Sequence, residues 1–279
     1  MRARLAHQRG GRGFVYATTG EKYTVLARRS ARSLRALHPD IPIDLFTDQP
    51  VTDPVFDRVH ALERVPPLAK IEALRRSRFR DSIYLDADTV AITRLDELFE
   101  MAGRFDLSAS MGLSRPGHMQ TWQRDIPRWF PVLNAGLLVY RQGRRTRRLS
   151  RLWQRAMERH EIGKDQPHLR RLAWDLGLRI GIVPLEYNLI QVSHLSIWET
   201  LMGAPRMLHV RALHDGPPGN PDEPIDWRAL VTPAQAARID ALLEGEARRN
   251  ACPQPTHPMR RHRLGLGLIR AWKRYGPLT

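Results

Sequence analysis

The chain is poor in cysteine and in long apolar runs. Its 279 residues include one cysteine, Cys252, which excludes an internal disulfide framework and a cysteine-rich zinc site. No apolar run approaches the roughly 18 residues that a membrane-spanning helix needs. Residues 1–10 also lack the apolar segment of a signal peptide. From these absences we expect a soluble protein of a reducing cytoplasm.

Acidic residues are scarce beside basic ones, because 29 Asp and Glu face 45 Lys and Arg, which gives a formal net charge of +16. Residues 1–13 contain four arginines and no acid, and residues 257–279 contain six Lys and Arg and no acid. Further arginines cluster between Arg141 and Arg151. This balance favours anionic partners, namely phosphorylated small molecules, nucleic acid or anionic lipid. The alternative is a set of solvated arginines with no dedicated partner.

Strand and helix patterns alternate along the chain. The order over the first ninety residues is β-α-β-α-β, which is typical of a parallel sheet with crossover helices. The apolar runs and the helical periodicity that predict it lie at 13–20, 23–37, 43–48, 68–79 and 82–90. After an irregular connection we expect a strand at 132–140, helices at 146–160 and 165–176, and late strands at 179–183 and 206–210.

The sequence therefore predicts one α/β domain over 13–250, flanked by two basic extensions. These are an N-terminal extension over 1–12 and a C-terminal tail over 251–279. A stretch rich in Pro and Gly from 216 to 224 separates the main body from a C-terminal appendage.

The triplet Asp86-Ala87-Asp88 follows the apolar run Ile83-Tyr84-Leu85. In an extended segment residues i and i+2 point the same way, so both carboxylates face one spot at the carboxyl end of a strand. Two such carboxylates suit a hard divalent cation, and that edge of an α/β sheet is where ligands bind. The alternative is a strand-ending turn with aspartate caps.

Several segments together resemble the family 8 retaining glycosyltransferases, which include glycogenin and bacterial lipopolysaccharide galactosyl- and glucosyltransferases. The similar segments occur in the family's order over about residues 13–212. They are Phe14–Thr19 with Tyr23, Lys70–Leu74, Asp81–Val90, Leu95–Phe99, Asn134–Val139, Asp165-Gln166, Leu185–Asn188 and Leu208–Val210. The resemblance implies a GT-A-type nucleotide-diphospho-sugar transferase domain, with a mostly parallel central sheet flanked by helices.

The resemblance also implies roles for individual residues. Asp86, Asp88 and His209 would hold Mn²⁺ or Mg²⁺, which would bridge the diphosphate of the donor. The donor and its sugar would be bound by Ala17, Thr19, Tyr23, Lys70, Ala87 and Asn134. Asp165 and Gln166 would be the catalytic pair that orients the anomeric carbon. No general base is required in a retaining transferase, because the departing phosphate can accept the acceptor's proton.

Each of these residues has a purely structural alternative. Asn134 precedes a glycine and suits a turn, Asp165 suits a helix N-cap, and His209 suits a buried, hydrogen-bonded position. His214 and His194 are rival metal ligands. The family's Lys-Pro-Trp after its histidine is missing here, and Arg211 is the candidate replacement. The ordered co-occurrence of the motifs favours the functional interpretation.

The predicted function is metal-dependent transfer of a sugar, with retention, from a nucleotide-diphosphate donor to a bacterial surface glycan or lipid-linked acceptor. UDP-sugars are the favoured donors. Two alternatives remain, which are a nucleic-acid-binding protein and a metal-dependent nucleotide-sugar hydrolase or nucleotidyltransferase. No zinc-finger spacing or aromatic-rich RNA-binding motif is present, so we expect no nucleic-acid partner.

The tail carries a separate signal. On helical spacing Leu264, Leu268, Trp272 and Tyr275 share one face, and most of the neighbouring cations lie elsewhere. A basic helix with an aromatic apolar face suits the surface of an anionic membrane, which predicts peripheral association with the inner membrane face. Packing of the same face on the domain is the alternative.

Overall fold

The computed structural model describes residues 11–63, 69–113, 122–159, 164–199 and 202–251. Seven strands form the central sheet in the order β3-β2-β1-β4-β7-β6-β8, and two form a small second sheet. The strands are β1 (Arg12–Thr18), β2 (Ile43–Thr47), β3 (Arg58–Ala61), β4 (Asp81–Leu85), β5 (Thr89–Ala91), β6 (Leu107–Met111), β7 (Leu133–Arg141), β8 (Ile180–Ile182) and β9 (Met207–His209).

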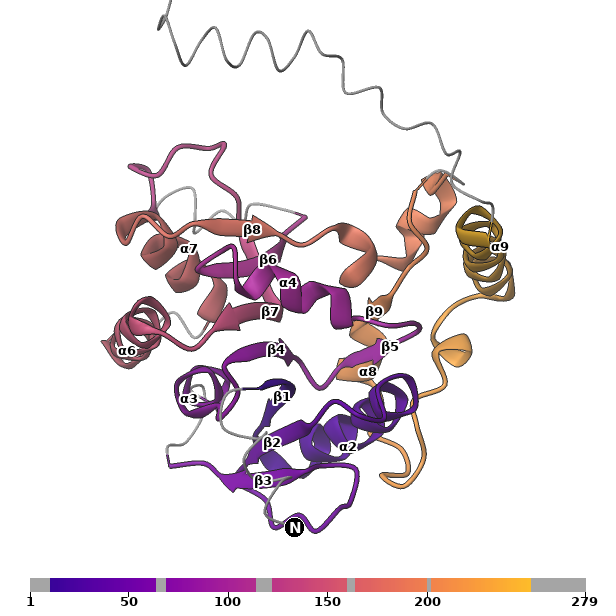
Figure 1. Ribbon diagram of the computed structural model, residues 1–279, viewed down its shortest axis with the longest axis horizontal. Helices are drawn as coiled ribbons and strands as arrows, with labels where there is room; N and C mark the ends of the chain where they lie inside the picture. The colour runs from indigo at the N-terminus through magenta and orange to yellow at the C-terminus, as the bar shows by residue number, and fades with distance from the viewer. Residues whose placement is uncertain (1–10, 64–68, 114–121, 160–163, 200–201, 252–279) are drawn as a thin grey trace, which may run out of the picture.

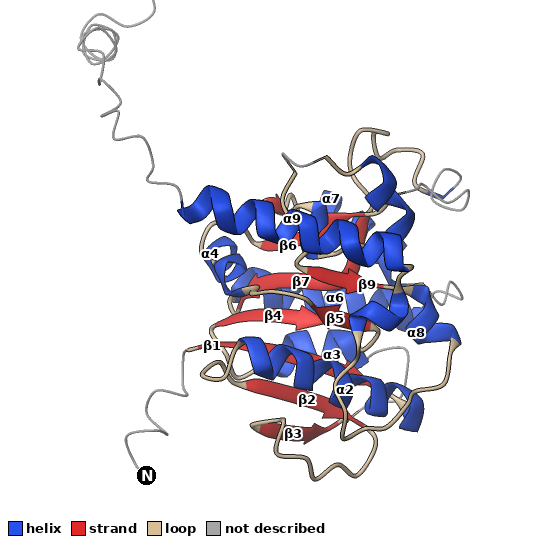
Figure 2. Ribbon diagram, turned by 90° about the vertical axis from the view of Figure 1, so that its right-hand side faces the viewer, coloured by secondary structure: helices blue, strands red, loops and turns tan. Residues whose placement is uncertain are grey.

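Helices cover both faces of the central sheet. The helices are α2 (Gly20–Leu37), α3 (Ala69–Arg76), α4 (Phe99–Ala102), α6 (Arg144–Arg159), α7 (Asp165–Asp175), α8 (Arg211–Asp215) and α9 (Pro233–Ala251). Short 3-10 segments occur at Asp96–Leu98, Leu185–Tyr187, Val192–Ile197 and Trp227–Leu230. One face carries α3, α6 and α7, and the other carries α2, α8 and α9 (Figures 1 and 2).

The predicted mostly parallel sheet is confirmed. β1 pairs in parallel with β2 and β4, β2 with β3, and β6 with β8. β7 runs antiparallel to both of its neighbours, β4 and β6. Along β1, Phe14 and Tyr16 pack into the core under α2, whereas Val15 packs into the core under α3 and α6. Burial on both faces is the reason why this strand reads as an unbroken apolar run.

The predicted strand over 82–90 is wrong in its second half. The strand ends at Leu85, the chain turns through residues 86–88, and β5 then pairs with β9 in the second sheet. The Thr89 hydroxyl donates to the Asp86 carbonyl at 2.7 Å and closes this turn. The late strand predicted over 206–210 is β9, so it also lies in the second sheet. Two strands of the central sheet, β3 and β6, are not predicted by the sequence pattern.

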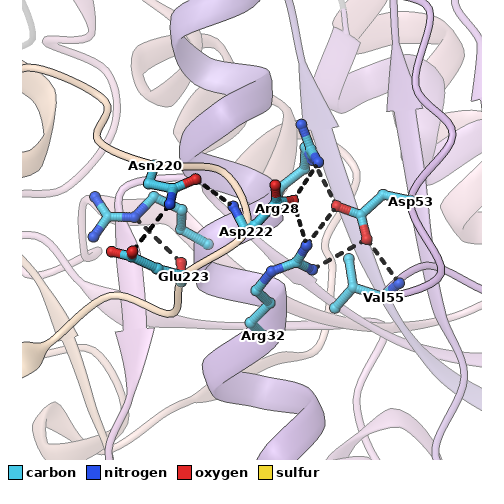
Figure 3. Close-up of polar contacts among 8 residues, drawn as sticks. Arg28, Arg32, Asp53, Val55, Asn220, Asp222 and Glu223 are labelled. Carbon is cyan, nitrogen blue, oxygen red and sulfur yellow. Dashed lines mark hydrogen bonds and ion pairs between the residues drawn. The ribbon is translucent and has the colours of Figure 1, made fainter.

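The stretch from 216 to 224 lies against α2 rather than standing apart from the domain. Arg29 donates to the Pro218 carbonyl at 2.8 Å, and Arg28 and Arg32 both pair with Asp222 (Figure 3). Beyond it, α9 buries Ile239 and Leu242 in the same core as α2. The chain from 216 through α9 is therefore packed on the body of the protein. No helix among the described residues is long and apolar enough to cross a membrane.

Candidate active site

Asp86 and Asp88 lie in the turn that follows β4, at the carboxyl end of the parallel strands. The Asp86 amide donates to the Gly136 carbonyl of the adjacent strand β7 at 2.8 Å, which holds the turn to the sheet. The two carboxylate side chains are half-buried, with 25% of Asp86 and 19% of Asp88 exposed. The sequence prediction of two carboxylates converging at a strand end thus describes their arrangement, although a turn rather than an extended strand produces it.

His209 completes a three-residue cluster with these two carboxylates. One ligand atom from each of Asp86, Asp88 and His209 lies within 4.8 Å of the others. The histidine reaches this place because it ends β9 and pairs with Thr89 of β5, directly after the turn. Its Nε2 lies 3.3 Å from Asp88 Oδ1. Two carboxylate oxygens and one imidazole nitrogen form a donor set that suits Mn²⁺ or a related divalent cation.

The His209 ring lies directly over Gly136. A Cβ atom at position 136 would lie 2.2 Å from His209 Cε1, a distance that real Cβ atoms do not reach. The glycine of β7 therefore makes room for the histidine. The absence of a side chain at Gly136 lets the imidazole ring lie beside the two carboxylates. This placement supports the fit of the three residues to a cation.

The charges of the cluster are strongly coupled. Burial raises the pKa of Asp88, but the hydrogen bond and charge of His209 outweigh it and hold that pKa below its usual value. Burial lowers the pKa of His209, but Asp88 and then Asp86 outweigh it and raise that pKa. The carboxylates that favour a proton on the histidine would equally favour a divalent cation there.

A chain of amides orients the histidine. The Gly136 amide donates to Asn134 Oδ1 at 2.9 Å, and Asn188 Nδ2 donates to the same oxygen at 2.9 Å. Asn188 Oδ1 then faces His209 Nδ1 at 3.0 Å. Because the Gly136 N–H can only donate, Asn134 Oδ1 is an acceptor and Asn188 presents its NH₂ group to it. Asn188 Oδ1 is therefore the group that faces His209 and accepts a hydrogen bond from Nδ1–H. Nε2 is left facing the carboxylates.

Lys70 links the cluster to the start of α7. Its Nζ lies 3.1 Å from Asp86 and 3.0 Å from Asp165, which is the first residue of α7. Burial opposes the lysine charge, but Asp165 and Asp86 outweigh it and raise the pKa of Lys70. The Tyr84 hydroxyl donates to Asp86 Oδ1 at 2.7 Å. Lys70 thus brings a fixed positive charge beside the carboxylates.

These side chains line one cleft of about 270 Å³. The cleft contains eight of the eleven site residues predicted from the sequence, namely Ala17, Thr19, Tyr23, Lys70, Asp86, Ala87, Asp88 and Asp165. It is also lined by Thr18, Ala69, Tyr84 and His214. Residues from β1, α2, α3, the β4 turn and α7 therefore meet at one edge of the sheet.

The other three predicted residues lie around this cleft. His209 belongs to the carboxylate cluster, and Asn134 lies behind it with 8% of its surface exposed. Gln166 is half-buried on α7, directly after Asp165. Asp165 does not cap α7, because the N-cap is Lys164, and its carboxylate is instead bonded to Lys70.

Among the described residues, neither rival histidine belongs to the carboxylate cluster, although His214 lines the cleft. His214 on α8 bonds through Nδ1 to the Tyr23 hydroxyl at 3.0 Å, and the two rings are 5.7 Å apart. His194 lies in the 3-10 segment Val192–Ile197, outside the residues that line the cleft. Arg211, the candidate replacement for the family lysine, is 87% exposed and pairs with Asp215, so it does not line the cleft either.

Three residues of the site were not predicted as site residues from the sequence. Tyr84 is two residues before Asp86 on the same strand, so the spacing that found the aspartates should have found it. Asn188 ends the segment Leu185–Asn188, and Gly136 lies within Asn134–Val139. Nothing in the sequence indicates that these last two contact His209, because β7, β9 and the chain before β9 meet only in the folded protein.

No protein-family model and no curated protein sequence matches the chain. Solved structures do match. Galactosyltransferase LgtC, in complex with donor and acceptor sugar analogues, has a TM-score of 0.56 at 15% identity, over 83% of this chain and 95% of LgtC. The chain has a GT-A fold.

Two further glycosyltransferases are similar over only part of their own length. The bifunctional WbbM matches with a TM-score of 0.54 at 13% identity, over 86% of this chain and 52% of WbbM. GlyE of Streptococcus pneumoniae TIGR4 matches with a TM-score of 0.52 at 18% identity, over 83% of this chain and 61% of GlyE. The fold that the sequence resemblance predicted is confirmed.

Proposed function

We propose that this chain is a metal-dependent glycosyltransferase that moves a sugar, with retention, from a nucleotide-diphosphate donor to a glycan or lipid-linked acceptor. The observation that carries the proposal is the cluster of Asp86, Asp88 and His209 within 4.8 Å, whose two carboxylates line a cleft together with Lys70 and Asp165. The LgtC structure was solved with donor and acceptor sugar analogues, and its fold matches over most of both chains. UDP-sugars are the donors to test first.

Each part of the cleft has a proposed task. Ala17, Thr19 and Tyr23 form the wall for the nucleotide, and Ala87 lies between the two carboxylates. Lys70 supplies a positive charge beside the diphosphate. Asn134, Asp165 and Gln166 orient the sugar. Bound Mn²⁺ or Mg²⁺ would neutralise the diphosphate as it leaves.

Calorimetry with UDP-sugars and Mn²⁺ tests the metal site. Asp86→Asn and Asp88→Asn should each abolish metal-dependent donor binding with the fold intact, because each removes a carboxylate from a three-residue cluster. Asp125→Asn is the matched control, since Asp125 is 59% exposed and pairs only with Arg171 among the described residues. Unchanged affinity in both site variants would refute the assignment. His209→Ala should weaken Mn²⁺ binding more than His214→Ala.

Product analysis separates this function from its alternatives. Transfer should release a nucleoside diphosphate and form a glycoside. Free sugar would indicate a hydrolase, and pyrophosphate would indicate a nucleotidyltransferase. The anomeric proton signal tests retention, because an α-linked donor should give an α-linked product, and a β-linked product would exclude retention.

The place of action is also a proposal. We propose a cytoplasmic protein that associates peripherally with the inner membrane face through its basic tail. Residues 251–279 lie, apart from Ala251, outside the described residues, so this proposal rests on their sequence. No nucleic acid is expected as a partner.

A further inference from the structure

Helix α6 presents a row of arginines to solvent. It contains seven arginines and one acid, Glu158. Its apolar and small side chains, among them Leu149, Trp153 and Met157, are buried against the body of the protein. The opposite side, which we call the arginine face, consists of the exposed Arg144, Arg147, Arg148, Arg151, Arg155 and Arg159.

The arginine face has no acidic partner among the residues that the structure describes. Over the described residues, arginines of other elements mostly pair with Asp or Glu, as Arg28 and Arg32 do with Asp53. On α6 itself, Arg145 pairs with Asp106 at 2.8 Å. The six arginines of the arginine face form no ion pair with a described residue. Like charges at i,i+4 destabilise a helix, so this face keeps a repulsion that an external anion would relieve.

The shape of the arginine face suits contact with a flat surface. Arg144, Arg148, Arg151, Arg155 and Arg159 follow one another at intervals of three or four residues, which places them in a straight row of about 22 Å. α3 and α7 pack beside α6, so the helix lies along the body and does not project from it. The exposed side of α6 carries no aromatic side chain on which a base could stack. A flat anionic surface matches these features better than a nucleic-acid strand or groove.

The buried side of α6 also contacts a residue that lines the cleft. Trp153 of α6 donates from its indole to the Asp165 carbonyl at 3.1 Å, and Asp165 lines the cleft. The last turns of α6 are therefore fixed to the cleft wall.

We propose that the arginine face of α6 is a docking surface for an anionic lipid membrane. Phosphatidylglycerol headgroups would supply the anionic partners that the six guanidinium groups lack among the described residues. The contact is electrostatic and does not require the tail. It does not depend on the proposed transferase activity either, because it can be measured without any sugar.

Vesicle sedimentation of the full chain tests the proposal. The vesicles are phosphatidylcholine with or without phosphatidylglycerol, at about 0.15 M salt. Each arginine near an anionic surface increases the membrane partition coefficient roughly fivefold. The double variant Arg151→Gln/Arg155→Gln should therefore bind about 30-fold more weakly. Binding should require phosphatidylglycerol and should fall further as salt is raised.

The matched control is Arg211→Gln/Arg248→Gln, which removes the same charge from α8 and α9 on the opposite face of the sheet (Figure 2). These two side chains are 87% and 80% exposed. The control should bind like the unmodified chain, and any contribution of the tail is the same in both variants. Circular dichroism should show equal folding of all three proteins.

Three results would overturn the proposal. Equal weakening in both variants would mean that net charge alone drives binding. Unchanged binding in Arg151→Gln/Arg155→Gln would mean that the arginine face is not the contact. Loss of duplex DNA binding in that variant, with vesicle binding retained, would assign the face to nucleic acid instead.

Discussion

At the residue scale, the candidate metal site depends on the small size of one residue. Gly136→Ala would place a Cβ atom only 2.2 Å from His209 Cε1. The ring must move, and we expect Mn²⁺ affinity to fall by about 10–100-fold, as for other changes that misplace a metal ligand. Calorimetric titration with Mn²⁺ measures this.

Gly143→Ala is the control for that change. The nearest atom to a Cβ at position 143 is the Arg141 carbonyl oxygen, at 3.9 Å, so the methyl group fits without displacement. Mn²⁺ affinity should remain at the wild-type value. If Gly136→Ala also kept that value, His209 could not be a ligand in the position described.

Asn188 gives a second residue-scale prediction, because its amide sets which nitrogen of His209 carries the proton. ¹⁵N chemical shifts at alkaline pH should show the Nδ1–H tautomer in the wild type. Asn188→Leu should lose this preference and weaken Mn²⁺ binding by about 10–100-fold. Asn188→Asp keeps an acceptor for Nδ1–H and should retain the tautomer. An unchanged tautomer in Asn188→Leu would show that Asn188 does not orient the ring.

At the element scale, the end of α2 is sensitive to acid through His38. Its side chain is fully buried, and its Nε2 accepts a hydrogen bond from the Leu95 amide at 3.1 Å. Burial, and then the charge of Arg94, lower the pKa of His38 to about 4. The folded protein keeps this histidine neutral, while the unfolded chain takes up a proton below about pH 6.5.

Titration of this histidine should therefore lower the stability of the fold as the pH is lowered. Between about pH 6.5 and 4 only the unfolded state binds the proton, so the free energy of unfolding should drop by about 3 kcal/mol in total. Urea unfolding over this range measures the loss. His38→Gln can accept from Leu95 without titrating, so its profile should be flatter. Parallel profiles for the two proteins would assign the acid loss to other groups.

The contact between α2 and the segment 216–224 gives another element-scale prediction (Figure 3). Arg28 and Arg32 bridge Asp53, whose side chain is 1% exposed, to Asp222, whose side chain is 70% exposed. Asp53→Asn leaves two half-buried guanidinium groups without their buried partner and should cost about 3 kcal/mol. Asp222→Asn should cost about 1 kcal/mol or less. Equal shifts in the urea midpoint of the two variants would contradict this ranking.

At the scale of the whole molecule, the tail is expected to add to membrane binding. Residues 257–279 carry six Lys and Arg and no acid. A chain that ends at Pro255 should therefore bind anionic vesicles more weakly than the full chain at low salt, because it loses both the cations and the apolar face. Sedimentation with phosphatidylglycerol vesicles measures the difference. Equal binding of the two chains would mean that the tail does not contribute to membrane association.

Several features of this protein follow from local chemistry and could be predicted from the sequence. The apolar run of β1, the periodicity of α2 and the carboxylates after β4 depend on residues close together in the chain, and each is found where it was predicted. The same holds for most cleft residues, because the carboxyl ends of parallel strands meet at one edge whatever the details of packing. The order of the family motifs along the chain predicted the GT-A fold.

Which histidine joins the carboxylates follows from the packing of distant segments and not from local sequence. His209 and His214 are five residues apart, and the order of the family's motifs favours His209 but leaves His214 as a rival. Pairing of β9 with β5 brings His209 to Asp88, whereas α8 turns His214 toward Tyr23. The choice depends on contacts between segments more than a hundred residues apart, which no local pattern encodes. The same reason hid Gly136 and Asn188, whose importance lies in the ring that packs against them.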